Sequence, residues 1–347
     1  MPDRIEARAP TRIDLAGGTV DLWPLYLLHE RPLTVNAAID LYAVARVEAR
    51  RDAGIELISK DRDARLRAAS LDDLVERIDK APADLEFPMR LAAHFLGAGR
   101  GTPGGRLSCR ITTECQAPAG SGLGGSSTLG IALASALDRF VGRGLSGAAL
   151  LAVTRAIETQ VIRIPTGEQD YHPALRGGAL ALHYTVEGTR VERLPVDLEA
   201  LRGRTVLVDT GQSRSSGISN WDMLKRRLDG DSRVRDALDG VIRATHAMRE
   251  ALIASDWEAA GAALGEEWSA RKALSSKVTH EGIDRLIREG IAAGAVAGKV
   301  CGAGGGGCLV LWAREGRREE IQERMAGLGA RVLDVHYTAA GVQVTEE

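Results

Sequence analysis

The chain has 347 residues, of which 44% are hydrophobic and 27% are charged, and its formal net charge is −2 at pH 7. This length allows one large domain or two ordinary ones, each able to bury a core. The balanced charge gives no support for a nucleic-acid partner or an anionic-membrane partner.

The first part of the chain mixes predicted strands and helices. Ile13 and Leu15 alternate with Arg12 and Asp14, so residues 4–16 are expected to form a half-buried strand that ends at Gly17. Further strands are predicted at 33–49, 54–59 and 107–114, and helices at 71–79 and 88–96.

A marked helix follows the glycine-rich segment 116–128. Leu129, Leu133, Leu137 and Val141 recur every four residues and form one apolar stripe. A second helix is predicted at 147–162. Residues 166–178 show no periodicity and are predicted to form a loop.

The rest of the chain is predicted to be mostly helical. Strands are expected at 179–184 and 205–210, and a glycine-rich loop at 302–307 precedes an apolar strand that runs to residue 313. The expected helices are 219–228, 233–254, 256–274, 279–293 and 317–327. We place a domain boundary near residue 190, which divides the chain into domains of residues 1–190 and 191–347.

Targeting and cysteine signals are weak. The charged N-terminal residues do not resemble a signal peptide, and no apolar run approaches the ~20 residues of a membrane helix. The cysteines, at positions 109, 115, 301 and 308, have no Cys-x2-Cys spacing, so reduced thiols are expected rather than a zinc site. We therefore expect a cytoplasmic protein.

Residues 116–128 are the most informative segment. Four glycines precede two serines and a threonine at the start of a helix, where backbone N–H groups and the helix dipole can hold a phosphate. A Walker A loop is excluded because no lysine follows the glycines. The segment 120–125 also matches Gly-x-Gly-x-x-Gly, but no acidic residue follows at the ribose-binding distance. A phosphate cradle, a dinucleotide site and a tightly packed helix start remain the alternatives.

Two further features suggest a site. Five glycines fall within residues 302–307, which allows close approach of the backbone to a ligand or to the first glycine loop. Asp170 lies in the segment 166–178, which shows no periodicity. A carboxylate there can accept a proton from the hydroxyl of a phosphoryl acceptor. Alone, an aspartate in a loop is more often a turn or cap residue, and a flexible turn is the alternative for the glycine loop.

Together, three segments resemble the motifs of the GHMP kinase superfamily. They are ARAPTRIDLAGG at 7–18, PAGSGLGGSS at 118–127 and KVCGAGGGG at 299–307. The resemblance covers essentially the whole chain. It implies an α+β protein with a left-handed βαβ phosphate-binding unit in the N-terminal domain, a ferredoxin-like C-terminal domain and the active site in the cleft between them.

A finer resemblance is to the heptose 7-phosphate kinase group. It rests on residues 15–21, AAIDLYA at 37–43, DTGQSRSS at 209–216 and CGAGGGG at 301–307. The group usually has Gly-Gly-Gly-Thr-Asp where this chain has Gly-Gly-Thr-Val-Asp at 17–21. Its acceptor loop is usually closer to Gly-Lys-Gln-Asp-Gln-Tyr, whereas residues 167–172 read Gly-Glu-Gln-Asp-Tyr-His.

The resemblance also implies roles for individual residues. Asp170 would be the catalytic carboxylate near the acceptor hydroxyl, and Arg12 would stabilise the developing charge or lower the pKa of that hydroxyl. Ser126 and Glu158 would bind Mg²⁺. ATP would be bound by Pro118, Gly120, Ser121, Gly122, Leu123, Gly124, Gly125, Ser126, Ser127 and Thr128. Substrate contacts would come from Gly18, Thr19, Asp21, Gln169, Arg214, Gly304 and Gly305.

We therefore expect an ATP- and Mg²⁺-dependent kinase for the anomeric hydroxyl of a heptose 7-phosphate or a related sugar, serving nucleotide-sugar or surface-polysaccharide biosynthesis. Another acceptor (fucose, arabinose, glucuronate or an octose phosphate) stays open. A non-catalytic sugar-binding regulator on the same fold and a dinucleotide oxidoreductase also stay open. The partner is expected to be a small molecule, without nucleic acid or membrane, and a homodimer is left open.

Overall fold

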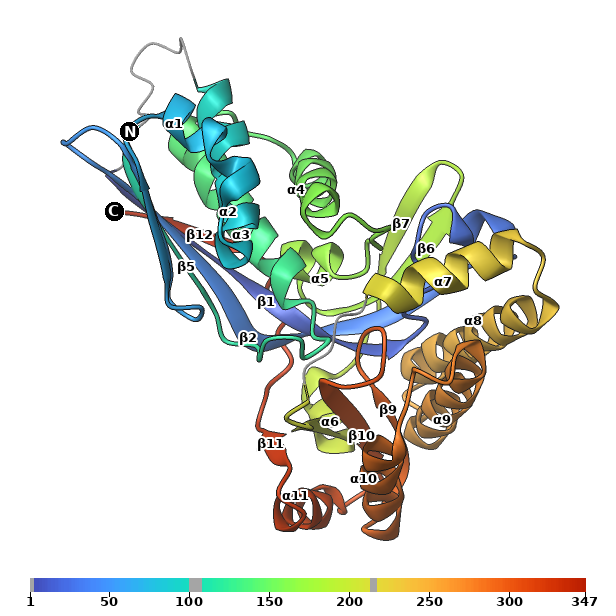
Figure 1. The fold of residues 1–347 in the computed structure, drawn as a ribbon. Coiled ribbons are helices and arrows are strands. Elements are labelled where there is room, and N and C mark those ends of the chain that lie inside the picture. The colour runs from blue at the N-terminus through green and yellow to red at the C-terminus, as the bar shows by residue number, and fades with distance from the viewer. Residues whose placement is uncertain (1–2, 100–107, 213–216) are drawn as a thin grey trace.

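The computed structural model describes residues 3–99, 108–212 and 217–347, apart from the side chains of 217–219. Two β-sheets, each covered by helices, make up the described chain (Figure 1). The long strands β1 (Arg4–Ala16) and β2 (Leu33–Ala49) pair in antiparallel fashion and run from the N-terminal part toward the C-terminal part. Side chains of these two strands therefore reach the region between the N-terminal part and the C-terminal part.

Within the described residues, the first sheet has eight strands in the order β12-β1-β2-β5-β3-β4, with β6 beside β2 and β7 beside β6. The further strands are β3 (Ile55–Ser59), β4 (Ala64–Ala68), β5 (Cys109–Cys115), β6 (Ala179–Thr185), β7 (Gly188–Arg193) and β12 (Gln343–Glu346). β3 and β5 are parallel, and the other pairs are antiparallel.

The burial of β1 departs from the predicted half-buried pattern. From Ala9 to Ala16 every side chain is buried, because helices pack on one side of the strand and the C-terminal part packs on the other. Arg12 and Asp14 are therefore buried charges rather than a solvated strand face. Buried charges require partners, and these partners form the site described below.

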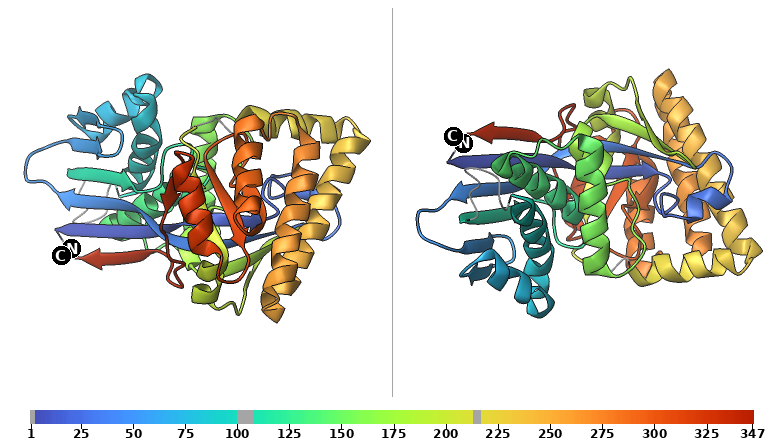
Figure 2. Two further views of the ribbon diagram at one scale, coloured as in Figure 1. Left: turned by 90° about the horizontal axis from the view of Figure 1, so that it is seen from below. Right: turned by 90° about the horizontal axis from the view of Figure 1, so that it is seen from above.

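Helices cover one face of this sheet (Figure 1; Figure 2, right). They are α1 (Leu71–Glu76), α2 (Ala83–Ala98), α3 (Gly125–Val141), α4 (Gly147–Ile162) and α5 (Tyr171–Arg176), with the short 3-10 helices η1 (Leu25–Leu28) and η2 (Ile78–Lys80). The predicted apolar stripe of α3 is confirmed for Leu133, Leu137 and Val141, which are buried in the core of this part.

The second sheet consists of β8 (Thr205–Asp209), β9 (Ala295–Val300), β10 (Cys308–Ala313) and β11 (Arg331–Leu333), in the antiparallel order β11-β8-β10-β9. α10 (Glu281–Ala292) and α11 (Arg318–Gly327) precede β9 and follow β10. This order of strands and helices is the ferredoxin-like arrangement that the resemblance implies.

Four further helices lie between β7 and α10 along the chain (Figure 1; Figure 2, left). They are α6 (Leu198–Arg204), α7 (Gly217–Leu228), α8 (Ser232–Ala254) and α9 (Trp257–Leu274). α8 contacts β2 of the first sheet, α9 contacts β9 of the second, and the two helices pack along each other. This helix pair carries side chains to both sheets at once.

The prediction of a loop over 166–178 is wrong in part, because residues 171–176 form α5. Six residues are too few to show a helical period, and Pro173 fits in a first helical turn. The predicted boundary at residue 190 falls inside β7, while β12 at the end of the chain pairs with β1. The division into domains stays a prediction.

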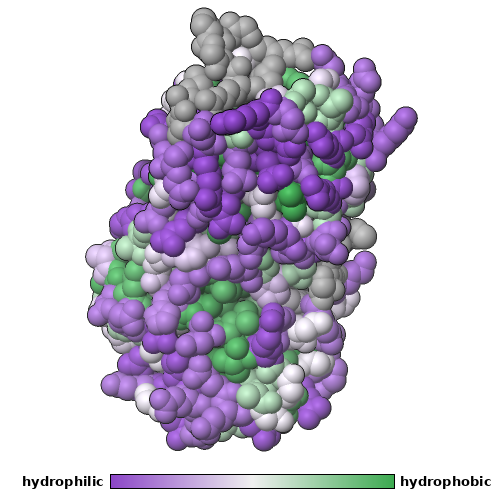
Figure 3. Space-filling view, turned by 90° about the vertical axis from the view of Figure 1, so that its left-hand side faces the viewer, coloured by the Kyte–Doolittle hydropathy of each residue, from purple (hydrophilic) through white to green (hydrophobic). Residues whose placement is uncertain are grey.

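The described surface is largely polar. Figure 3 shows one face, mostly hydrophilic, with a limited hydrophobic area in its lower half. Among the described helices, none is both long enough and apolar enough to cross a membrane. All four cysteines are free thiols, as predicted, and only Cys115 is not fully buried.

Candidate active site

A cleft of about 700 Å³ lies between the helices on the first sheet and the loops of the C-terminal part. Its walls come from residues 12–22, 61–62, 83–88, 115–129, 158–170, 302–303 and Asn220. The three sequence motifs, which are far apart along the chain, therefore meet in one cavity.

The glycine-rich loop forms the wall at the start of α3. Gly120, Gly122 and Gly124 have φ of 67°, 75° and 75°, in the left-handed region that favours glycine. Gly124 supplies no side-chain cap to α3, and the first helical hydrogen bond runs from Thr128 N–H to Gly124 O at 2.9 Å. The first three N–H groups of α3 therefore have no helical partner, which makes this helix start a binding site for anions such as phosphate.

We expect the substitution Gly122→Ala to destabilise the cleft. A Cβ atom at this position would lie 2.3 Å from the Cys301 carbonyl oxygen, on a backbone of positive φ. The strained backbone alone costs about 1–3 kcal/mol, and the overlap adds to it. Urea unfolding and ATP titration calorimetry should show lower stability and weaker ATP binding.

The matched control is Gly142→Ala, where φ is +71° but no heavy atom lies within 4 Å of the new Cβ. Gly142→Ala has the same backbone strain as Gly122→Ala, but its new Cβ atom overlaps with no other atom. Equal losses of stability in the two variants would contradict the close contact between the glycine loop and residue 301.

Arg12 joins the glycine loop to Asp170. Its Nη1 donates to the Gly122 carbonyl at 2.5 Å, its Nη2 forms an ion pair with Asp170, and its backbone N–H donates to Leu123 O at 3.1 Å. Burial disfavours the charge of Arg12, but Asp170 and Asp14 outweigh it and raise the pKa of the guanidinium. A fixed positive charge therefore stands between the phosphate cradle and the carboxylate.

Glu158 reaches the start of α3 from α4. Its Oε2 accepts hydrogen bonds from Ser127 Oγ at 2.8 Å and from Tyr171 OH at 2.5 Å. Burial raises the pKa of Glu158, although hydrogen bonds from Ser126, Tyr171 and Ser127 oppose this shift. A buried carboxylate beside an uncapped helix start is a suitable ligand for a cation that also binds phosphate.

Asp21 occupies the other end of the cleft. Its Oδ2 accepts the Gln169 N–H at 3.0 Å, and burial raises the pKa of Asp21 to about 6. The Asn36 amide donates to Gln169 O at 3.1 Å, while Gln169 Oε1 and Asn36 Oδ1 are buried without a partner. This end of the cleft therefore offers carboxylate and amide oxygens that can accept hydrogen bonds.

The glycine loop at 302–307 contacts the glycine loop at 120–125. An ideal Cβ on Gly302 would lie 3.0 Å from Gly122 Cα, so the two loops touch through their backbones. Gly302 and Ala303 line the cleft. Gly305 N–H instead donates to Val278 O at 2.6 Å, and a Cβ on Gly304 would lie 2.7 Å from the same oxygen.

A buried ion network supports these loops from behind. Lys299 Nζ lies 3.2 Å from both Asp14 Oδ1 and Glu267 Oε1. Arg271 pairs with Glu267 at 2.5 Å and with Asp14 at 3.3 Å, and it donates to Gly302 O at 2.6 Å and to Gly18 O at 2.9 Å. The network thus ties β1, α9 and β9 to the glycine motifs at 17–18 and 302–307.

Most of the residues predicted for the site line the cleft. They are Arg12, Thr19, Asp21, Pro118, Gly120, Ser121, Gly122, Gly124, Gly125, Ser126, Ser127, Glu158, Gln169 and Asp170. The cleft walls do not include Gly18, Leu123, Thr128, Gly304 or Gly305. Arg214 lies outside the described residues.

Sequence reasoning missed several wall residues. Asn220 comes from α7, and Phe87, Val161 and Ile162 form an apolar end of the cleft beyond the glycine loop. The ion partners Glu267 and Arg271 were also missed. Both lie on α9, which carries no motif, and an i, i+4 pair of opposite charges resembles an ordinary solvated pair in the sequence.

Comparison with known families identifies this constellation. The family described as GHMP kinases N terminal domain matches residues 88–178, and GHMP kinases C terminal matches residues 248–330. The chain belongs to the GHMP kinases. As a member it is an ATP-dependent phosphotransferase, and the alternative of a dinucleotide oxidoreductase no longer applies.

Individual GHMP kinases resemble the chain over most of its length. The D-glycero-alpha-D-manno-heptose 7-phosphate kinase of Campylobacter jejuni is 26% identical over 344 residues, covering 98% of both chains. An L-fucokinase/L-fucose-1-P guanylyltransferase of Bacteroides fragilis is 25% identical over 97% of this chain, which spans 38% of that enzyme.

The predicted GHMP kinase fold is confirmed by solved structures. A D-glycero-D-manno-heptose 1-phosphate kinase from Bacteroides thetaiotaomicron superposes with a TM-score of 0.80, at 24% identity and 99% coverage of both chains. A mevalonate kinase superposes with a TM-score of 0.77 at 16% identity, covering 96% of this chain and 99% of that one. The fold is thus shared by kinases whose names give different acceptors.

Proposed function

We propose that this GHMP kinase transfers phosphate from Mg-ATP to the anomeric hydroxyl of a heptose 7-phosphate or a closely related sugar. The observation that carries the proposal is the acceptor end of the cleft, where Asp21, Gln169 and Asp170 present oxygens that accept hydrogen bonds. A polyhydroxyl substrate supplies the donors that these oxygens lack. The full-length similarity to the heptose 7-phosphate kinase of C. jejuni supports the same class of substrate.

The charge at this end of the cleft argues against a carboxylate acceptor such as mevalonate. Asp170 lies close enough to help raise the pKa of Asp21, and Asp21 is buried. A substrate carboxylate placed beside them would be repelled, whereas neutral hydroxyls would be bound. Arg214 remains a predicted contact for the distal phosphate of the sugar.

In this proposal Asp170 accepts the proton of the attacking hydroxyl. An anomeric hydroxyl is more acidic than an ordinary alcohol, so a modest carboxylate base suffices for it. Arg12 holds Asp170 on one side and the Gly122 carbonyl on the other, which fixes the base next to the phosphate cradle. Its positive charge also stabilises negative charge that develops on the transferred phosphoryl group.

In this proposal ATP binds to the cleft walls that the acceptor does not occupy. Its phosphates would bind the N–H groups of the glycine loop and of the start of α3, and its adenine would lie against Phe87, Val161 and Ile162. Ser126 and Glu158 would hold Mg²⁺, since one carboxylate with phosphate oxygens and water is a usual Mg²⁺ environment. When bound, the ion would neutralise charge on the phosphates.

The assignment of the Mg²⁺ ligand can be tested with Glu158→Gln. An amide is a weaker ligand for Mg²⁺ than a carboxylate, so the Mg²⁺ concentration for half-maximal activity is expected to rise about tenfold or more, with lower kcat. Mg²⁺ titrations of activity measure this directly. The matched control, Glu250→Gln on the exposed face of α8, should leave the titration unchanged.

Binding of the acceptor should depend on pH through Asp21. Because its pKa is raised to about 6, the carboxylate that accepts sugar hydroxyls is lost as pH falls below 6. The value of kcat/KM for the acceptor is therefore expected to fall about tenfold per pH unit below that point. Asp21→Asn should lower kcat/KM and remove this limb of the pH profile. An unchanged limb in the variant would assign the titration to another group.

The raised pKa of Asp21 also has a consequence for stability. A carboxyl that holds its proton more tightly when folded contributes stability at acidic pH, and that contribution is lost as pH rises through 6. At neutral pH, the charged Asp21 carboxylate therefore lowers the stability of the folded protein while it serves to bind the acceptor.

The proposal is tested by measuring ADP release from Mg-ATP with a panel of acceptors. The panel contains heptose 7-phosphate, free heptose, fucose, galactose, mannose and, as a non-sugar control, mevalonate. Selective turnover of heptose 7-phosphate supports the proposal. Selective turnover of fucose or galactose would replace the acceptor, and turnover of mevalonate alone would overturn the sugar assignment.

A further inference from the structure

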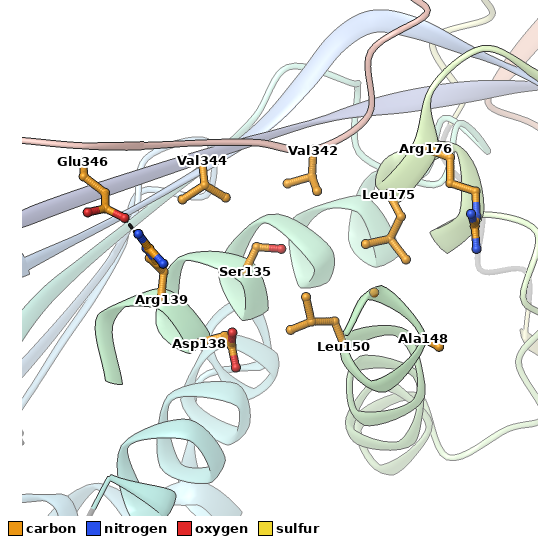
Figure 4. Close-up of a pocket in the computed structure, with 11 residues that line it drawn as sticks. Ser135, Asp138, Arg139, Ala148, Leu150, Leu175, Arg176, Val342, Val344 and Glu346 are labelled. Carbon is orange, nitrogen blue, oxygen red and sulfur yellow. Dashed lines mark hydrogen bonds and ion pairs between the residues drawn. The ribbon is translucent and has the colours of Figure 1, made fainter. Parts of the chain in front are cut away.

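A second pocket, separate from the catalytic cleft, lies on the helical side of the first sheet (Figure 4). It is open to solvent, has a volume of about 590 Å³ and is lined by α3, the start of α4, the end of α5 and the C-terminal segment that includes β12. None of its lining residues lines the catalytic cleft. No role assigned above involves it.

The middle of this pocket is apolar. Leu150, Leu175, Val342 and Val344 surround it from three different segments (Figure 4). The hydroxyl of Ser135 points into this space, is 94% buried by residue and has no hydrogen-bond partner. A buried hydroxyl without a partner is uncommon, and a bound molecule with a polar group would satisfy it.

One end of the pocket carries uncompensated positive charge. The Arg176 side chain forms no ion pair among the described residues. Gly147 and Ala148, the first residues of α4, lie at the same end, and the Ser146 side chain caps only the Ala149 N–H. Two free N–H groups at a helix start and a free guanidinium favour an anion there.

The two acidic side chains of the pocket lie away from this positive charge (Figure 4). Asp138 points away from the apolar space, and both of its oxygens accept the Leu145 N–H (Figure 4). Glu346 forms an ion pair with Arg139 at the opposite end (Figure 4). The pocket therefore has a neutral ion pair at one end, an apolar middle and a cationic end.

We propose that this pocket binds an amphipathic organic anion, with an apolar body between the leucine and valine side chains and an anionic group at Arg176 and the start of α4. A hydroxyl, ether or carbonyl group within the body would pair with Ser135. Burial of the apolar body supplies most of the binding energy, and the charge fixes its orientation.

Occupancy of the pocket is coupled to the catalytic cleft through three helices. α3 carries Ser127 at its other end, α4 carries Glu158, and α5 follows directly after Asp170. Ser127 and Tyr171 both donate to Glu158, so the three helices are linked by hydrogen bonds at the cleft. A ligand that binds between the ends of these helices farthest from the cleft therefore changes the affinity of the protein for ATP. By the same factor, bound ATP changes the affinity of the protein for that ligand.

The test uses 8-anilinonaphthalene-1-sulfonate, a fluorescent amphipathic anion, with the full-length protein. We expect saturable binding that persists when a non-hydrolysable ATP analogue fills the cleft, with an affinity for the analogue shifted at least about fivefold. Loss of the fluorescence on adding the analogue, in proportion to occupancy of the cleft, would show that the probe binds the catalytic site and would overturn the proposal.

Two substitutions locate the probe. Arg176→Gln is expected to weaken its binding about tenfold, because one charge-assisted hydrogen bond is lost. Ser135→Leu fills the apolar space and should abolish binding, while Ser135→Ala keeps the space and should bind the probe more weakly than wild type. Neither residue belongs to the catalytic cleft.

The control is Arg235→Gln, which removes an exposed arginine of α8 that pairs with Asp236. It should bind the probe as wild type does. Circular dichroism and thermal unfolding confirm that each variant is folded. Equal binding by wild type and Arg176→Gln, or by wild type and folded Ser135→Leu, would overturn the site, as would the absence of saturable binding. Binding at the site without any shift in ATP affinity would overturn the coupling.

Discussion

Replacing Asp170 by asparagine is expected to lower kcat by about 10²–10⁴-fold. The amide has nearly the same shape as the carboxylate and can still accept a hydrogen bond from Arg12, but it cannot accept the proton of the attacking hydroxyl. The affinity for Mg-ATP should stay within a few-fold of wild type, because the glycine loop and α3 are untouched. Steady-state kinetics and ATP titration calorimetry separate these two effects.

The control for this variant is Asp84→Asn, another carboxylate of the same cleft, which is half exposed. It should retain near wild-type kcat. Near wild-type turnover in Asp170→Asn would remove this residue from the chemistry and leave positioning by Arg12 and the phosphate cradle to account for catalysis.

Replacing Lys299 by methionine is expected to destabilise the protein by about 3–5 kcal/mol. Lys299, Asp14, Glu267 and Arg271 are almost completely buried and carry two charges of each sign. Loss of the lysine leaves two buried carboxylates that share one guanidinium, and the cost of an unpaired buried charge falls on the folded state. Urea-induced unfolding measures the free energy difference.

Two comparisons isolate the network. Lys225→Met removes a lysine of similar length whose ion pair with Asp229 is exposed, and it should leave the free energy of unfolding nearly unchanged. In the double variant with Glu267→Gln, removal of one charge of each sign should make the loss smaller than the sum of the single losses. Equal effects of Lys299→Met and Lys225→Met would contradict a supporting role for the network.

The network also predicts how stability depends on pH. Burial opposes ionisation of Asp14, but Lys299 and Arg271 outweigh it and lower the pKa of this carboxyl below its usual value. The stabilisation is therefore present above the usual carboxyl pKa and is lost as pH falls through the lowered pKa. Acid unfolding should thus begin where Asp14 gains its proton.

Elements with a strong pattern were predictable from the sequence. The bounds of β1, β2 and α4 agree with the predicted ranges, because long apolar patterns and clear end signals fix them. Short elements were missed, among them β4, β7, α5 and α6. Elements of five to seven residues show too little of a period to be recognised, and tertiary contacts decide whether they form.

The residues of the site also fall into predictable and unpredictable groups. The glycine loop, Arg12 and Asp170 carry recognisable motifs, and the structure brings them together in one cleft. The partners of Asp14 could not be predicted, because Arg271 and Lys299 approach it from segments more than 200 residues away along the chain. Three-dimensional packing, rather than any local pattern, makes these charges buried and mutually dependent.

The proposed acceptor is tested most directly by ³¹P NMR of the product formed from heptose 7-phosphate and Mg-ATP. The account predicts a second sugar phosphate resonance, coupled to the anomeric proton, that grows as the γ-phosphate resonance of ATP declines. No phosphorylated sugar beyond the starting compound, or a new phosphate on a carbon other than the anomeric one, would contradict it.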